Sequence, residues 1–145
     1  MKIKFKKLNS LAKTPIRGSE YAAGYDLYAA IEEPITIEPH TTVKINSGLA
    51  FELPENTFGA IVARSGLATK EGLRLANCVG ICDADYRGPY TIPLHNDGTE
   101  VKTIFPGERI AQLILLPFIP MEFEEVTELN ETSRGDGGFG STGIK

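Results

Sequence analysis

The sequence predicts an all-β fold, either a barrel or a jelly roll. Short apolar or alternating runs recur along the first 126 residues, and each has the length of an ordinary strand. Turn-forming residues separate these runs, as at Glu38-Pro39, Asn96-Asp97-Gly98 and Pro106-Gly107. Helical periodicity is confined to one short window, 65–71, in which Ser65 would be the N-cap.

Each strand is expected from its own run of apolar, β-branched or aromatic residues. The expected strands are 2–6, 26–29, 35–37, 42–45, 49–53, 58–63, 79–83, 90–95, 101–104, 109–116 and 122–126. Pro93 lacks the N–H donor of a central strand, so it predicts an edge or a bulge. After residue 126, Glu, Ser, Thr and Gly dominate, and they bury too little surface to fix a structure. We therefore expect a β-domain over 1–126 and a flexible, glycine-rich flap over 127–145.

Length and charge narrow the classes of protein. The 145 residues suit one domain with its own core, and no apolar run reaches the roughly 18 residues of a membrane helix. The N-terminal lysines are not followed by the apolar core of a signal peptide, so the cytoplasm is the expected compartment. The net charge of −4 is concentrated at the end, where residues 121–145 contain six acids and two bases. These features argue against nucleic-acid and membrane partners.

The cysteines and histidines do not form a recognisable reactive centre. Cys78 and Cys82 would lie roughly 13 Å apart on a straight strand, which is too far for a disulfide. No histidine or further cysteine stands near them, so we interpret them as small apolar residues rather than zinc ligands. Neither His40 nor His95 has a nucleophile and an orienting group in a triad pattern.

Residues 77–88 contain a pair of carboxylates beside an aromatic residue and an arginine. On an extended backbone Asp83 and Asp85 would share one face, while Ala84 and Tyr86 would take the other. The simplest interpretation is a hairpin whose Asp and Gly residues form the bend. The alternative is an acidic site beside a turn, and these residues alone leave both interpretations open.

Three other positions carry groups that suit an anion or a metal. At Arg64-Ser65-Gly66 a strand leads into the short helix, so amides, a hydroxyl and a guanidinium converge where a phosphate binds well. Gln112 interrupts an apolar run, and it either satisfies backbone groups or faces a ligand. Asp26 begins a strand, where it would orient waters around a hard cation or simply form a turn.

The glycine-rich tail is either passive or a closing flap. Gly135, Gly137 and Gly140 match the pattern G-x-G-x-x-G, but the dinucleotide fingerprint needs a helix there and only five residues follow. In a flap, Arg134 would grip a phosphate and Phe139 would cover a ring, while glycine amides approach the ligand.

Five segments, in this order, closely resemble the five motifs of the trimeric dUTP pyrophosphatase (dUTPase) family. The match covers nearly the whole chain. The segments are Ala23-Gly-Tyr-Asp-Leu27, Arg64-Ser-Gly-Leu-Ala68, Asn77-Cys-Val-Gly-Ile-Cys-Asp-Ala-Asp-Tyr-Arg-Gly88, Pro106-Gly-Glu-Arg-Ile-Ala-Gln112 and Arg134-Gly-Asp-Gly-Gly-Phe-Gly-Ser-Thr-Gly143. Two positions depart from the usual motifs: Ala63 stands where a proline opens the second, and Cys82 where Ile or a similar residue precedes the aspartate of the third. Neither departure removes a reactive group.

The resemblance implies a homotrimer of distorted β-barrel, jelly-roll-like (β-clip) subunits with shared active sites at their interfaces. The substrate would be dUTP, and Asp83 would be the general base that activates a water for attack on the α-phosphorus. Mg²⁺ would be held mainly by the phosphates, and Asp26 would reach its waters. Uracil and deoxyribose would be bound by Asn77, Gly80, Ile81, Cys82, Tyr86 and Phe139, and the phosphates by Arg64, Ser65, Gly66, Gln112, Arg134, Gly140, Ser141 and Thr142. Hydrolysis to dUMP and pyrophosphate would keep uracil out of DNA and supply dUMP for dTMP synthesis.

Two other functions stay open at this point. The dCTP deaminases resemble dUTPases in fold and in the arginine-serine segment, but their catalytic glutamate would fall at Pro93, which cannot transfer protons. They also typically carry Trp where Tyr86 stands. The non-enzymatic alternative is a nucleotide-gated interaction protein, against which the intact Asp83 and Arg134 argue.

Overall fold

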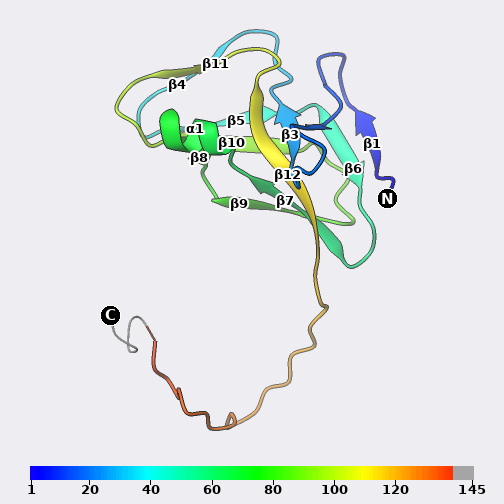
Figure 1. Ribbon diagram of the computed structural model, residues 1–145, viewed down its shortest axis with the longest axis vertical. Helices are drawn as coiled ribbons and strands as arrows, with labels where there is room; N and C mark the ends of the chain where they lie inside the picture. Colours follow the sequence, from blue (N-terminus) through cyan, green and yellow to red (C-terminus); the bar gives the residue numbers. More distant parts are fainter. Residues whose placement is uncertain (139–145) are drawn as a thin grey trace.

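The computed structural model describes residues 1–138, which form twelve strands and one short helix (Figure 1). The helix is α1 (Ser65–Lys70). The strands are β1 (Lys4–Lys7), β2 (Ile16–Arg17), β3 (Tyr25–Tyr28), β4 (Ile35–Ile37), β5 (Thr42–Asn46), β6 (Leu49–Glu52), β7 (Thr57–Val62), β8 (Leu73–Leu75), β9 (Val79–Asp83), β10 (Thr91–Asn96), β11 (Lys102–Ile104) and β12 (Arg109–Pro117). The prediction of an all-β fold with one short helix is confirmed. No helix in this part of the chain is long and apolar enough to cross a membrane.

The strands pair in antiparallel fashion and form four sheets. The largest sheet has the order β2-β3-β12-β7-β9, and the smaller ones are β5-β10-β8, β1-β6 and β11-β4. In the large sheet, Gln112 of β12 lies opposite Asp26 of β3 on one side and Val62 of β7 on the other. Residues that the sequence assigned to a phosphate or metal site are therefore neighbours across this sheet.

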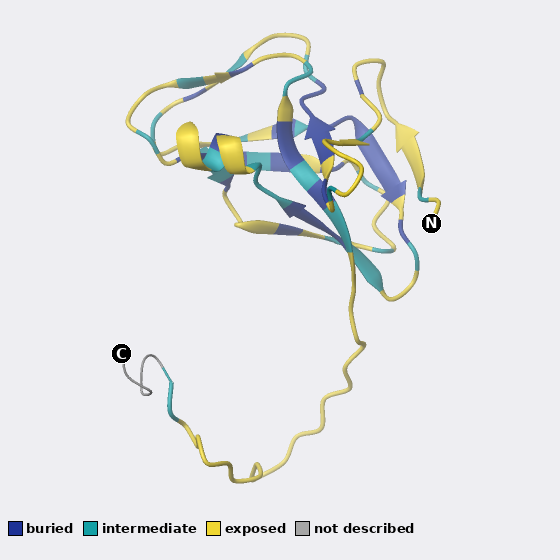
Figure 2. Cartoon of the chain, viewed as in Figure 1, coloured by how far each residue is buried: buried dark blue, intermediate teal, exposed yellow. Residues whose placement is uncertain are grey.

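The core lies between the sheets and is built from alternating residues of their strands (Figure 2). In β10, Ile92 and Leu94 are fully buried, whereas the adjacent Thr91 is exposed. Asn96 is also buried, and its amide donates to the carbonyls of Ile37 and Glu100 at 3.0 and 2.8 Å. A buried amide that is satisfied in this way fixes the following turn to the core.

Several local predictions are wrong. The residue pattern does not predict β2 or β8, which are only two and three residues long. Ser65 is the first residue of α1 rather than its cap, because Arg64 has the extended backbone of the cap and no side chain caps the helix. Segment 122–126 forms no strand in the described chain, where no neighbouring strand lies beside it.

Pro93 lies in a central strand rather than at an edge, and the register of β10 with β5 passes it without a bulge. Its carbonyl accepts a hydrogen bond from the Ala76 amide at 2.8 Å. The second bond of this pair would run from an N–H of residue 93 to the Ala76 carbonyl, and a proline has no N–H to donate. Ala76 lies one residue beyond the end of β8. The missing donor therefore costs no bond of the regular ladder.

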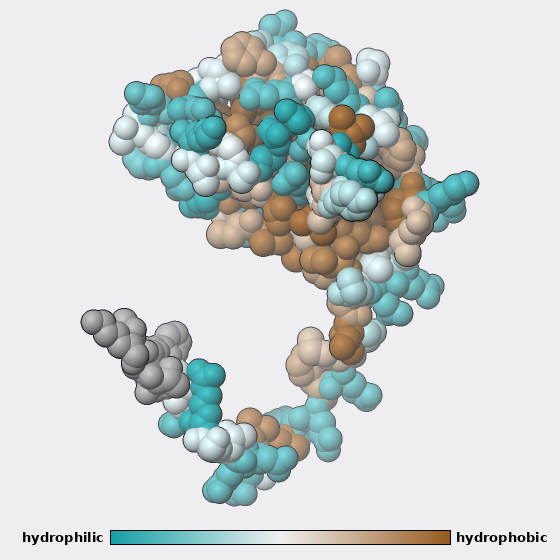
Figure 3. All heavy atoms as spheres, in the orientation of Figure 1, coloured by the Kyte–Doolittle hydropathy of each residue, from teal (hydrophilic) through white to brown (hydrophobic). Residues whose placement is uncertain are grey.

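The C-terminal arm, residues 118–138, leads away from the body as an extended segment (Figure 1). Its large apolar side chains are exposed, with Ile119 at 85% and Phe123 at 87% of full exposure. Apolar side chains also gather on the body surface near the point where the chain leaves it (Figure 3). In the described part of the chain, the last strand thus ends at Pro117.

Candidate functional site

Residues 76–78 form a tight corner that carries the chain from one sheet to another. β8 pairs with β10, whereas β9 pairs with β7. At the corner Cys78 has a φ of 61°, and the amides of Cys78 and Val79 donate to the carbonyls of Leu75 and Asn77 at 3.1 and 2.6 Å. β9 emerges as the edge strand of the large sheet. The N–H and C=O groups on its free side are available to a planar ligand with matching donors and acceptors.

The hairpin that the sequence suggested around Asp83 is not formed. β9 ends at Asp83, whose carbonyl accepts a 3.1 Å bond from the Tyr86 amide in a turn. The next strand, β10, pairs with β5 and β8 rather than with β9. Because the extended backbone stops at Asp83, Asp85 lies in the turn and does not share its face by strand alternation.

A hollow of about 280 Å³ opens beside β9, and we call it the β9 pocket. Gly80 is buried in the wall of this pocket. A Cβ at Gly80 would come within 3.2 Å of the Ile61 side chain and 3.7 Å of the side-chain nitrogen of Asn77. Every described residue that the resemblance assigned to base, sugar or general-base function contributes to the pocket. It is lined by Ile61, Leu75, Asn77, Gly80, Ile81, Cys82, Asp83, Tyr86, Pro89, Tyr90, Thr91 and Pro93.

Tyr86 is held in the β9 pocket by its own loop. Its hydroxyl donates to the Pro89 carbonyl at 3.2 Å, and its ring stacks on Tyr90 with centroids 6.1 Å apart and an angle of 26° between the planes. The ring lies against Gly88, where a Cβ would approach the Tyr86 hydroxyl to 2.4 Å. Tyr86 is nonetheless 43% exposed, so part of its surface is available to a ligand.

The thiol and the phenol inside the pocket stay neutral at ordinary pH. Burial is the main reason that the pKa of Cys82 is raised, and the nearby Tyr90 hydroxyl acts in the opposite direction. Burial is also the main reason that the pKa of Tyr90 is raised. Neither group is therefore a ready nucleophile or base, and among the described residues both cysteines are free thiols.

A second group of polar residues is centred on Asp26, which is only 2% exposed. One carboxylate oxygen accepts from Arg64 Nε at 3.1 Å, and the other accepts from Arg109 Nη1 at 3.2 Å. Arg64 also donates to the Arg109 carbonyl at 3.4 Å. Gln112 packs over Gly24, where a Cβ would come within 3.2 Å of its side chain. Two guanidinium groups thus lie on one buried carboxylate beside an amide, an arrangement that suits an anion.

The single chain does not bring these two groups together. Asp83 pairs with Phe58 at one end of β7, whereas Val79 pairs with Val62 at the other. Phe58 and Val62 are roughly 13 Å apart at about 3.3 Å per residue, and Arg64 lies beyond Val62. One chain therefore cannot place its Asp83 and its Arg64 on neighbouring phosphates of one nucleotide.

The remaining predicted phosphate ligands are incompletely placed. Ser65 and Gly66 are exposed in the first turn of α1, next to Arg64. Arg134 lies in the C-terminal arm, where its Nε donates to the Gly137 carbonyl at 2.8 Å. Four further predicted ligands lie outside the described residues: Phe139, Gly140, Ser141 and Thr142.

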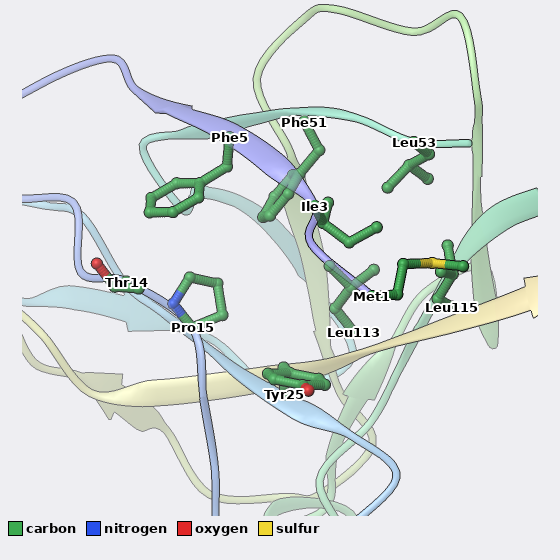
Figure 4. Close-up of a pocket in the computed structure, with 10 residues that line it drawn as sticks. All are labelled: Met1, Ile3, Phe5, Thr14, Pro15, Tyr25, Phe51, Leu53, Leu113 and Leu115. Carbon is green, nitrogen blue, oxygen red and sulfur yellow. The ribbon is translucent and has the colours of Figure 1, made fainter.

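A further hollow of about 390 Å³ lies near the N-terminus (Figure 4). It is walled almost entirely by apolar side chains, and no charged side chain contributes to it. Its lining residues are Met1, Ile3, Phe5, Thr14, Pro15, Tyr25, Phe51, Leu53, Leu113 and Leu115. Without groups to hold phosphates, this cavity is not the nucleotide site.

Several residues of the site were not assigned from the sequence, and Arg109 and Tyr90 are the two with the most extensive contacts. Arg109 lies inside the fourth motif, three residues before Gln112. This position in the motif could have indicated a role for Arg109 in the site. Its place beside Asp26 depends on an irregularity in β12 between Arg109 and Ala111, which no pattern indicates. Tyr90 gave no signal, because an aromatic residue at the start of a strand is ordinary.

The free edge of β9, the carboxylate in the β9 pocket and the pair of arginines on Asp26 suit an all-β protein that binds a nucleotide. Comparison with known proteins narrows this class. The family model described as dUTPase matches residues 11–143. The chain is 48% identical over 145 residues to a deoxyuridine 5′-triphosphate nucleotidohydrolase of Desulfitobacterium hafniense, covering 99% of this chain and 96% of that one. A protein of the same name from Coxiella burnetii is 45% identical over 144 residues, covering 99% and 95%.

The solved structures agree with this result. A mutant dUTPase of Staphylococcus bacteriophage 80alpha, solved with dUpNHpp, superposes with a TM-score of 0.90 at 29% identity and covers 99% of both chains. A mutant dUTPase of phage phi11 of S. aureus, described with a structural Mg(II) ion, has a TM-score of 0.82 at 24% identity, which shows likeness of fold. The chain belongs to the dUTPase family.

Proposed function

We propose that this protein hydrolyses dUTP to dUMP and pyrophosphate, with Asp83 as the general base. The observation that carries the proposal is the β9 pocket, which unites Asp83 with the residues predicted to bind the base and sugar. Membership of the dUTPase family supports the same reaction. In the cytoplasm, its expected compartment, the reaction would keep uracil out of DNA and supply dUMP for dTMP synthesis.

Asp83 is suited to activating a water molecule. Its side chain is exposed, and in the described part of the chain it forms no salt bridge that would occupy its oxygens. The carboxylate would take a proton as the water oxygen attacks the α-phosphorus in line. The new P–O bond forms as the bond between the α-phosphorus and the bridging oxygen breaks, and pyrophosphate leaves with that oxygen.

The β9 pocket would select the nucleoside. The free edge of β9 offers backbone donors and acceptors to the uracil ring, and Gly80 removes the side chain that would cover them. Asn77, Ile81 and Cys82 would contact the base, while Tyr86 would pack under the deoxyribose and exclude a 2′-hydroxyl. Phe139 would cover the uracil from the tail.

The triphosphate would be held at the other group of residues. Arg64 and Gln112 would bind phosphate oxygens, assisted by Ser65 and the Gly66 amide. The salt bridge to Asp26 fixes the direction of the Arg64 guanidinium before the substrate arrives. From the tail, Arg134 would bind the γ-phosphate, and residues 140–142 would close over the site.

We expect Mg²⁺ to enter this site bound to the triphosphate of the substrate and not to protein ligands alone. No group of three or more His, Cys, Asp or Glu in the described residues is placed to hold a metal ion. Both oxygens of Asp26 already face guanidinium groups, so this residue would reach the ion only through waters. Bound to the triphosphate, Mg²⁺ would neutralise charge at the reacting phosphates.

A homotrimer with shared sites accounts for the divided site. A second chain would supply the Arg64 group that the first cannot bring to its own Asp83. Two surfaces support association with other copies. Val79 and Ile81 of β9 are 44% and 60% exposed, and the arm presents Ile119, Met121 and Phe123 at the spacing of one face of a strand.

Product analysis with dUTP, dCTP, dTTP and UTP in Mg²⁺ tests the reaction. Pyrophosphate release from dUTP alone is expected, whereas ammonia release from dCTP would indicate a deaminase. Asp83→Asn should bind dUTP with turnover reduced by roughly 10²- to 10⁴-fold, the usual contribution of a general base. Asp85→Asn, two residues away in the turn, is the matched control and should keep nearly full turnover. Equal rates for Asp83→Asn and the unaltered protein would remove the base assignment.

A further inference from the structure

We infer that Tyr90 is a positioning residue that holds the Tyr86 ring and thereby sets how strongly the β9 pocket prefers deoxyribose to ribose. The inference rests on the proposed function, in which Tyr86 packs under the sugar. It goes beyond that function because the proposed function gives no role to Tyr90, which contributes to the wall of the β9 pocket and stacks on Tyr86.

The Tyr86 ring is held at its edge and supported from behind. Its hydroxyl is held by the Pro89 carbonyl at 3.2 Å, and Gly88 leaves room for the ring to fold back. The support is Tyr90, which stacks on it with centroids 6.1 Å apart and an angle of 26° between the planes. A single hydrogen bond at the tip lets a phenol ring pivot, so the stacking partner decides its tilt.

Tyr90 itself is fixed by the core. It is 1% exposed, and its amide donates to the Leu49 carbonyl at 2.8 Å. Its carbonyl accepts from both the amide and the hydroxyl of Ser47, at 3.0 and 2.7 Å. On its other side the ring packs against Phe51, with centroids 4.6 Å apart. The Tyr86 ring therefore packs against a residue whose own position is fixed.

The ring of Tyr90, and not its hydroxyl, performs this role. Among the described residues the buried hydroxyl forms no hydrogen bond of ordinary geometry, although the Cys82 thiol lies near it, and a Cβ on Gly59 would lie 3.4 Å from it. A buried polar group without a partner destabilises a fold. Tyr90→Phe keeps the stacking surface and removes only the unpaired group, so it should be at least as stable as the unaltered protein.

A 2′-hydroxyl is excluded only if the surface beneath the sugar stays in place. Tyr90→Leu removes the flat support, and the Tyr86 ring gains the freedom to tilt away from a ribose. The preference for dUTP over UTP should then fall by roughly two- to tenfold, the range that corresponds to one aromatic pair. The loss should come mainly from a higher rate with UTP, since dUTP does not need the ring to exclude an oxygen.

The test is the ratio of kcat/KM for dUTP to that for UTP, measured on the full chain. Tyr90→Phe should keep the ratio, and Tyr90→Leu should lower it. Ile104→Ala is the control for general loosening of the core, because Ile104 is fully buried in the β11-β4 sheet and belongs to neither aromatic pair. It should destabilise the protein and leave the ratio unchanged. If Tyr90→Leu does not yield folded protein, Tyr90→Met, which is longer and adaptable, makes the same test.

The outcomes separate the inference from the proposed function. An unaltered protein that does not hydrolyse dUTP, or that uses UTP equally well, would overturn the proposed function and the inference with it. An unaltered protein that prefers dUTP, with an unchanged ratio in Tyr90→Leu, would overturn the inference alone. An equal fall in Ile104→Ala would also overturn it, because general loosening of the core would then explain the effect.

Discussion

The buried carboxylate of Asp26 offers the sharpest test of how the proposed phosphate-binding group is built. Asp26→Asn keeps the shape of the side chain and removes the charge that faces Arg64 and Arg109. The side chain of Asp26 is 3% exposed, whereas those of Arg64 and Arg109 are 26% and 48% exposed. The substitution therefore leaves two guanidinium groups that have lost their partner but can still turn towards water.

The expected loss of stability in Asp26→Asn follows from these exposed fractions. Removing one partner of a fully buried pair costs about 3–5 kcal/mol, and losing a hydrogen bond to a charged group costs about 1.5–3 kcal/mol. Because both arginines reach solvent, we expect the lower range, roughly 2 kcal/mol of unfolding free energy, or about 4–8 °C in Tm for a chain of this size. The rate should fall further than stability, by roughly 10- to 100-fold in kcat/KM, since Arg64 loses its direction.

Thermal unfolding and steady-state rates measure the two effects. Asp97→Asn is the matched control, because Asp97 also holds an arginine, Arg74, through two hydrogen bonds but is 47% exposed. It should change stability little and leave the rate unchanged. A double-mutant cycle of Asp26→Asn with Arg64→Gln should show a coupling above about 1 kcal/mol. Additive effects, or an Asp26→Asn protein as stable and active as its parent, would refute the account.

Two further results are expected. The pKa values of Cys82 and Tyr90 are raised by burial from ordinary values of 9.0 and 10.0, so the unfolded chain loses these protons at lower pH than the folded chain does. The stability that the two neutral groups contribute should be complete below pH 9 and should be lost as the pH rises above that value. Denaturant unfolding at a series of pH values would measure the loss, and a Cys82→Ala/Tyr90→Phe variant should lose less unfolding free energy over the same range. Second, co-refolding Asp83→Asn with Arg64→Gln should restore activity in about a quarter of the sites if each site joins two chains; no recovery would mean that one chain supplies both groups.

Alternation of apolar residues predicted the strands that cover the core. β10 is the clearest case, since the fully buried Ile92 and Leu94 alternate with less buried neighbours. β8 escaped prediction because three residues cannot show a period, and its buried Leu73 and Leu75 follow directly after a helix. Segment 122–126 shows the opposite failure. Its pattern suits a strand, but a strand also needs a neighbour to pair with, and local sequence does not say where that neighbour lies.

The sequence could suggest members of the candidate site but not their arrangement. Asn77, Gly80 and Asp83 line one hollow because they are close in sequence, and residues of β7, β8 and β10 complete its wall. The salt bridge between Asp26 and Arg64 joins residues 38 positions apart, and only the order of strands in the large sheet makes it possible. The distance between Asp83 and Arg64 likewise comes from the register of β7 with β9, which no motif contains.

That separation along β7 has a consequence for how activity would arise in a cell. A newly made chain can fold, bury its core and form the β9 pocket, yet in the proposed assembly it would turn over no substrate until other copies dock. Activity would then appear with a delay that shortens steeply as chain concentration rises, because assembly is a multi-body event. Dilution to concentrations at which the assembly dissociates would abolish activity without unfolding the chain. Because the register of β7 with β9 separates Asp83 from Arg64, the specific activity would in this way depend on the protein concentration.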